Sequence, residues 1–138
     1  MFVLENIYAE LALKEAKKSL RTNDVPVGAV IVQNGKVIAK GHNTKEKKQI
    51  VTKHAEINAI EKACRKKKTW YLNDCDIYVT LEPCPMCLNA IKQAHIKKVI
   101  FLTKQEKQIN YKDTELIYLN INEKSKDMLR NFFKSKRK

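Results

Sequence analysis

The sequence has no apolar run that approaches the length of a bilayer-spanning helix, so we expect no membrane segment. It also has no internal repeat and no low-complexity linker. The chain is 138 residues long, with 43% apolar and 31% charged residues, which is the composition of an ordinary globular protein. A chain of this length can bury a core without disulfide bonds. We therefore expect a single domain over residues 1–138.

Acidic residues are scarce, with 15 Asp and Glu against 28 Lys and Arg, and the formal net charge is +13. The basic residues gather in "KEKK", "RKKK" and the terminal "KSKRK". Such an excess favours a polyanionic partner and argues against a small cationic one. A coding bias towards lysine could also produce it, so charge alone leaves both interpretations open.

The sequence shows no export signal at its N-terminal segment. Glu5, Glu10 and Glu15 interrupt the apolar positions there, which is unlike a signal or transit peptide. We therefore expect a cytoplasmic protein, in which metal or thiol chemistry is a stronger prediction for cysteines than disulfides. The four cysteines are Cys64, Cys75, Cys84 and Cys87.

Helical and strand-like patterns alternate along the chain. Apolar residues at helical spacing predict a helix over about 3–21. Asn34-Gly35 between two β-branched runs predicts a hairpin with strands near 27–33 and 36–41. The later elements are expected as a helix at 54–67, a strand at 76–81, a helix at 84–94, strands at 97–102 and 116–121, and a helix at 123–133. This order predicts an α/β fold of three layers, with a mixed sheet of about five strands between helices.

The stretch "EPCPMC" places Cys84 and Cys87 at the start of a predicted helix. Cys84 falls near the N-cap and Pro85 near the first helical position, which proline favours. Thiolates are stabilised at a helix N-terminus, and this spacing lets both sulfurs reach one metal ion. Taken alone, the pair could equally be a redox dithiol.

The stretch "HAE" lies thirty residues upstream and supplies His54 and Glu56. One imidazole and two thiolates form a ligand set that suits zinc. Cys64, Cys75 and His95 are each expected to lie too far away along their helix or strand to be a fourth ligand, and only His42 stays open. Water is then the expected fourth ligand, which is typical of a catalytic zinc site. Glu56 becomes the proton carrier, although an acid at a helix N-terminus can also serve the helix dipole.

Together, "HAE" and "PCPMC" match the H-x-E…P-C-x-x-C signature, and the chain resembles the zinc-dependent nucleoside and nucleobase deaminases. The resemblance is closest to the bacterial tRNA adenosine deaminases. It runs over about residues 4–101, through "VPVGAVIV", "GHN", "HAEINAI", "YVTLEPCPMC" and "KKVIF", and the terminal "LRNFFKSKRK" is also similar.

The resemblance implies a cytidine-deaminase-like fold and one Zn²⁺ per chain on His54, Cys84 and Cys87. It implies hydrolytic deamination of adenosine to inosine at the tRNA wobble position, with Glu56 as the proton shuttle. The Asn43 side chain and the Ala55 backbone amide are expected to hold the flipped base. The expected partners are a tRNA anticodon stem-loop and a second copy of the chain.

The segment after the fourth strand departs from the family pattern. Gln105 stands near a position that is usually acidic, the usual glycines are absent, and residues 102–115 are only just long enough for a parallel crossover. Two alternatives follow: a deaminase of a free base or nucleoside such as cytosine or guanine, and a non-catalytic zinc-stabilised RNA-binding module closed by His42. The run Trp70-Tyr71-Leu72 is interpreted as a contact surface in preference to core.

Overall fold

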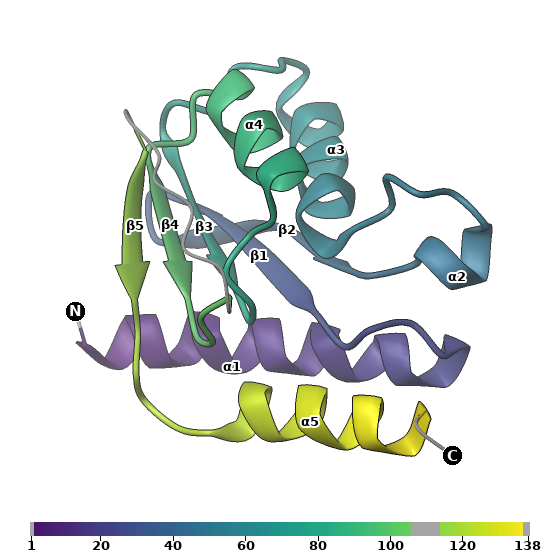
Figure 1. Cartoon of the computed structure of the whole chain (residues 1–138). Coiled ribbons are helices and arrows are strands. Elements are labelled where there is room, and N and C mark those ends of the chain that lie inside the picture. Colours follow the sequence, from purple (N-terminus) through teal and green to yellow (C-terminus); the bar gives the residue numbers. More distant parts are fainter. Residues whose placement is uncertain (1, 106–113, 137–138) are drawn as a thin grey trace.

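A mixed five-stranded sheet forms the centre of the molecule (Figure 1). The computed structural model describes residues 2–105 and 114–136. The strand order is β2-β1-β3-β4-β5, in which β1 pairs antiparallel with both β2 and β3, while β3, β4 and β5 are parallel. The bounds are β1 Gly28–Gln33, β2 Lys36–His42, β3 Cys75–Val79, β4 Lys98–Phe101 and β5 Glu115–Tyr118. The predicted mixed sheet and opening hairpin are confirmed.

Helices cover both faces of this sheet, as the sequence predicts (Figure 1). Helices α3 and α4 lie on one face, and α1 lies on the other with α5 packed beside it. A salt bridge between Lys124 and Glu10 joins α5 to α1. The bounds are α1 Phe2–Ser19, α2 Lys45–Lys48, α3 Ala55–Lys67, α4 Pro85–Gln93 and α5 Lys124–Lys136. None of the helices within the described residues has the length and hydropathy of a membrane span.

The central strands are apolar on both sides because each face is covered. Ile31 and Ile77 belong to the cluster under α3 and α4, whereas their neighbours Val30 and Tyr78 pack with Tyr8 of α1. This alternation follows from the two-residue period of a strand. The parallel β4–β5 pair is also formed, so the connection is long enough, but its residues 106–113 lie outside the described residues.

A glycine allows α3 to approach β2 closely. A β carbon on Gly41 would lie 2.5 Å from the Ala55 carbonyl oxygen and 2.7 Å from the Ala59 nitrogen. Any side chain there would push the first turn of α3 away from the sheet. The position of His54, which caps that turn, therefore depends on Gly41.

The run Trp70-Tyr71-Leu72 is divided between core and surface. Leu72 is fully buried, so its interpretation as a contact residue was wrong. Its burial follows from its place in the cluster between the sheet and the α3–α4 layer. Trp70 and Tyr71 are exposed.

Candidate active site

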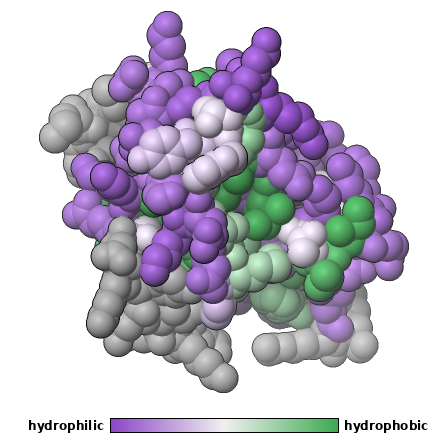
Figure 2. Space-filling view, turned by 90° about the horizontal axis from the view of Figure 1, so that it is seen from above, coloured by the Kyte–Doolittle hydropathy of each residue, from purple (hydrophilic) through white to green (hydrophobic). Residues whose placement is uncertain are grey.

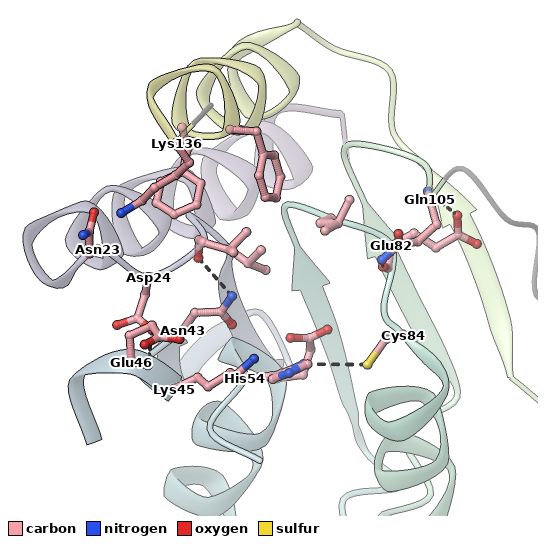
Figure 3. Close-up of a pocket in the computed structure, with 16 residues that line it drawn as sticks. Asn23, Asp24, Asn43, Lys45, Glu46, His54, Glu82, Cys84, Gln105 and Lys136 are labelled. Carbon is pink, nitrogen blue, oxygen red and sulfur yellow. Dashed lines mark hydrogen bonds between the residues drawn. The ribbon is translucent and has the colours of Figure 1, made fainter. Parts of the chain in front are cut away.

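Helices α3 and α4 begin beside each other, and each begins at a candidate metal ligand (Figure 3). His54 is the N-cap of α3, Cys84 is the N-cap of α4 and Pro85 follows at its first position. The His54 Nδ1 atom lies 3.7 Å from the Cys84 Sγ and 3.5 Å from the Cys87 Sγ. The three ligand atoms all lie within 4.8 Å of one another. The structure thus brings together the three residues that the sequence predicts.

The group has three members among the described residues, and none of the candidates for a fourth protein ligand joins it. His42, the one residue left open by spacing, has its Nδ1 3.6 Å from a carboxylate oxygen of Glu15 on α1. Cys64, Cys75 and His95 are not part of the group. A site with three protein ligands leaves a coordination position open, as catalytic zinc sites do.

The two thiols differ in their affinity for a proton. The pKa of Cys84 is lowered to about 4, first by its hydrogen bond with Cys87 and next by that with His54. The same bond to Cys84, together with burial, raises the pKa of Cys87. The pKa of His54 is raised, mainly by its bond with Cys84. A cation at this position would replace the shared protons, because metal ions bind the deprotonated forms.

Glu56 lies on the first turn of α3, lines the same pocket as His54 and Cys84, and is only 3% exposed. Burial raises the pKa of its carboxyl from 4.5 to about 7. It is not part of the ligand group among the described residues, and its expected role as a neighbour of the metal stays a prediction. A carboxyl with this pKa can accept and release a proton near neutral pH, which is what general acid–base catalysis requires.

Asn43 and Ala55 are joined by a hydrogen bond. The Ala55 N–H donates to the Asn43 Oδ1 at 2.7 Å, and the Asn43 Nδ2 donates to the Val25 carbonyl oxygen at 2.9 Å. Asn43 therefore fastens the start of α3 to the loop before β1. Its side chain also borders the pocket. The expected contact of these two residues with a base stays a prediction.

A pocket of about 520 Å³ opens in front of the group (Figure 3). One side, which we call the metal wall, is formed by His54, Glu56 and Cys84. The other side, the aromatic wall, comes from α5 and is formed by Phe132, Phe133 and Lys136. The two phenyl rings meet edge to face with centroids 5.4 Å apart, and the Lys136 Nζ lies 5.6 Å from the centre of the Phe132 ring.

The aromatic wall was not predicted as part of the site. Residues 132–136 lie far along the chain from all three candidate ligands, and no local pattern shows where α5 packs. The only signal was the likeness of the terminal "LRNFFKSKRK" to the family ending.

Helix α2 forms the rim of the pocket and was also not predicted. The buried Asp24 carboxylate accepts hydrogen bonds from the backbone N–H groups of Glu46, at 2.6 Å, and Lys47, at 3.3 Å. These bonds satisfy the free donors at the helix start. They hold Lys45 at the pocket edge. The sequence "KEKK" has no apolar periodicity, so pattern analysis has nothing to detect there.

Gln105 lies at the pocket and is paired with Glu82. The Glu82 carboxylate accepts from the Gln105 backbone N–H, and the Glu82 carbonyl oxygen accepts from its side-chain Nε2, both at 2.9 Å. These bonds fix the loop after β4 beside Cys84. A neutral amide therefore stands at the pocket edge where the family resemblance implies an acidic side chain.

A family model for MafB19-like deaminases matches residues 5–137. The chain belongs to this deaminase family. The match covers nearly the whole sequence, including the ligand group and α5.

The similarity extends to proteins with more specific descriptions. A tRNA-specific adenosine deaminase of Aquifex aeolicus is 47% identical over 100 residues, which are 72% of this chain and 66% of that relative. The chain thus spans just under two thirds of its length. A solved structure from work on A-to-I editing by tRNA:A34 deaminases at the wobble position of transfer RNA is 32% identical, with a TM-score of 0.76, and covers 83% of this chain and 98% of its own.

A guanine deaminase of Bacillus subtilis is also similar. Its structure is 28% identical with a TM-score of 0.69, and the alignment covers 96% of this chain and 92% of that one. The predicted cytidine-deaminase-like fold is confirmed by these structural neighbours.

Proposed function

We propose that this chain is a zinc-dependent hydrolase that converts adenosine to inosine in tRNA at the anticodon wobble position. The observation that carries the proposal is the His54, Cys84 and Cys87 group next to the buried Glu56, in a pocket of a chain 47% identical to a tRNA-specific adenosine deaminase. We include one Zn²⁺ per chain and a single catalytic domain over residues 1–138.

The three ligand atoms fit a zinc ion. Two thiol sulfurs and an imidazole nitrogen are donors that zinc prefers, and their mutual distances allow one ion to contact all three. When bound, zinc supplies a Lewis acid that makes water a nucleophile near neutral pH. His54 and Cys84 are fixed as helix N-caps, so the chain presents these donors without rearranging its backbone.

Glu56 would carry the protons of the reaction. Its carboxylate accepts a proton from the attacking water and delivers it to a purine ring nitrogen, and it then moves the remaining hydroxyl proton to the exocyclic amino group, which leaves as ammonia as the C–N bond breaks. The buried position keeps its pKa near 7, so both protonation states are accessible at neutral pH. The low exposure also keeps bulk water from competing for the proton.

The pocket suits a single base turned out of an RNA strand. Phe132 and Phe133 offer ring faces and edges for stacking, and Val25, Val27 and Leu81 add apolar surface. Lys45 and Lys136 stand at two sides of the pocket, where phosphates of a bound strand would pass. The net charge of +13 supports a polyanionic substrate. We propose that Asn43 and Ala55 contact the base once it is bound, by exchanging the bond between them for bonds to the purine.

We further propose that the protein acts in the cytoplasm as a homodimer, since the anticodon loop of a tRNA is reached there and the family resemblance implies two copies.

A second candidate is deamination of a free base of the guanine type. It is favoured by the likeness to the Bacillus subtilis guanine deaminase over 96% of this chain. In that case the basic surface would be incidental.

The test is deamination of an anticodon stem-loop with adenosine at the wobble position, followed by inosine mapping. Free adenosine, cytosine and guanine are assayed in parallel by ammonia release. We expect inosine in the RNA at that one position, none after chelation, and restoration by added Zn²⁺. Ammonia from free guanine with unchanged RNA would overturn the proposal in favour of the second candidate.

A further inference from the structure

Three aromatic rings meet on the surface, away from the pocket. Trp70 and Tyr71 come from the connection between α3 and β3, and His95 follows α4. The ring centroids are 5.8 Å apart for Trp70 and Tyr71, 4.8 Å for Tyr71 and His95, and 5.8 Å for Trp70 and His95. We call these three residues the aromatic platform. Trp70 is 65% exposed and Tyr71 is 44% exposed, so much of their ring surface faces solvent.

The backbone holds the aromatic platform rigidly. The Tyr71 N–H donates to the Thr69 Oγ1 at 3.1 Å, and the next residue, Leu72, is buried in the core. The Leu72 N–H donates to the Ala94 carbonyl oxygen at 2.8 Å, which joins the two segments that carry the rings. A backbone fixed in this way loses little conformational freedom when a ligand stacks on the rings that it carries.

Exposed basic residues flank these rings in the sequence. Exposed Arg65, Lys66 and Lys68 precede Trp70 at the end of α3, and Lys97 follows His95. The nearest acid along the chain, Asp74, is already paired with Lys67. A depression of about 330 Å³ lies beside His95, lined by Lys92, Gln93, His95, Ile96, Lys97 and Thr114. Figure 2 looks onto the face that contains the end of α3 and shows hydrophilic residues over most of it.

The aromatic platform lies at the opposite end of α3 from the metal group. A helix of 13 residues is about 20 Å long, so Trp70 is on the order of 20 Å from His54. None of the three platform residues lines the pocket. Lysines at a helix C-terminus also serve the helix dipole, but that role does not require an exposed tryptophan.

We infer that the aromatic platform binds a single-stranded segment of RNA, separately from the pocket. An unpaired base stacks on Trp70 and Tyr71, while Arg65, Lys66, Lys68 and Lys97 contact the phosphates on either side. Stacking on aromatic side chains within a basic surface is how proteins bind single strands without reading sequence. A second copy of the chain is a poorer occupant, because two copies meeting here would place like charges against each other. This inference shares one element with the proposed function, which is that the protein binds RNA.

The fluorescence of Trp70 tests this directly, since it is the only tryptophan in the chain. Zinc-loaded Glu56→Gln protein, which cannot turn over, is titrated with an oligouridylate of about 12 nucleotides. We expect quenching of Trp70 emission that saturates and weakens with added salt. In a parallel anisotropy assay with labelled RNA, Trp70→Leu and Tyr71→Ala should each weaken binding about tenfold. Ile7→Ala, which truncates an exposed apolar residue on α1, should leave the affinity unchanged.

Unquenched emission at RNA concentrations that saturate anisotropy would overturn the inference. A change of emission with protein concentration alone would also overturn it and assign the surface to contact between copies. Deamination of a short anticodon stem-loop by the wild-type protein is measured separately. If the wild-type protein forms no inosine in the stem-loop, only the proposed function is overturned. If Trp70 emission is not quenched by RNA, only the inference about the aromatic platform is overturned.

Discussion

The metal wall and the aromatic wall of the pocket are built in different ways. Residues of the metal wall lie on the first turns of α3 and α4, which pack on the central strands, and Glu56 among them is buried. The aromatic wall lies on α5, whose only buried side chains in the described structure are Ser125 and Leu129. The proposed reacting groups are thus fixed by the core, whereas the wall that we propose for substrate recognition is attached to the surface. Substitutions in the two walls should therefore have different consequences.

The largest effect is expected on the metal wall, from Glu56→Gln. Loss of the proton carrier should lower kcat by about 10²–10⁴-fold while zinc content stays near one per chain. Kinetics on the stem-loop RNA with metal analysis of the same sample checks this. Loss of zinc in the variant would show that Glu56 holds the metal, contrary to its place outside the ligand group.

The same substitution should change how stability depends on pH in the chelated protein. The folded-state pKa of Glu56 is raised to about 7, so the folded protein binds its proton more tightly than the unfolded chain does. Stability should then fall as pH rises from about 4.5 to about 7, by at most on the order of 3 kcal/mol. Urea unfolding across this range should show a shallower fall for Glu56→Gln. Equal slopes in both proteins would contradict the raised pKa.

Gly41→Ala tests whether the core positions the metal wall. The added methyl group meets backbone atoms of α3, so we expect a loss of about 1–3 kcal/mol in the free energy of unfolding and weaker zinc binding. Urea titration and competition with a chelator measure the two effects. Lys40→Ala, at the exposed neighbouring position, is the control. If Gly41→Ala is destabilised but binds zinc with wild-type affinity, the geometry of the metal wall does not depend on the packing of α3.

On the aromatic wall, Phe132→Ala and Phe133→Ala should each lower kcat/KM on RNA about tenfold, because one stacking surface is lost. Zinc content and the unfolding midpoint should change little. Asn131→Ala, exposed on the same helix, is the matched control. A matching fall in zinc content would show that α5 supports the metal wall as well.

The smallest effect is expected from Lys136→Ala. One phosphate contact should be lost, so affinity should fall less than about fivefold at low salt and the salt dependence should decrease by about one unit of slope. Binding measured at several salt concentrations checks this. An unchanged salt dependence of the affinity would show that the bound RNA strand does not contact Lys136.

The sequence predicted that the residues of the metal wall lie together, because the signals for their positions are local. The Asn34-Gly35 turn identifies the hairpin, and Pro85 identifies the start of α4. Helical rise then removes Cys64 as a ligand. The aromatic wall, the Asp24 cap of α2 and the bond from Ala55 to Asn43 join residues that are distant in the chain or lack a periodic pattern. Only the packed structure brings them together.

Lys136, the last residue of α5, borders the pocket, whereas α1 begins at the other side of the molecule (Figure 1). This has a practical consequence for anyone who purifies or immobilises the protein. An affinity tag fused after α5 would emerge at the pocket mouth and obstruct a bulky nucleic acid, even while a small nucleoside still entered. A tag ahead of α1 avoids that artefact, and comparing the two fusions would reveal how large a substrate the pocket has to admit.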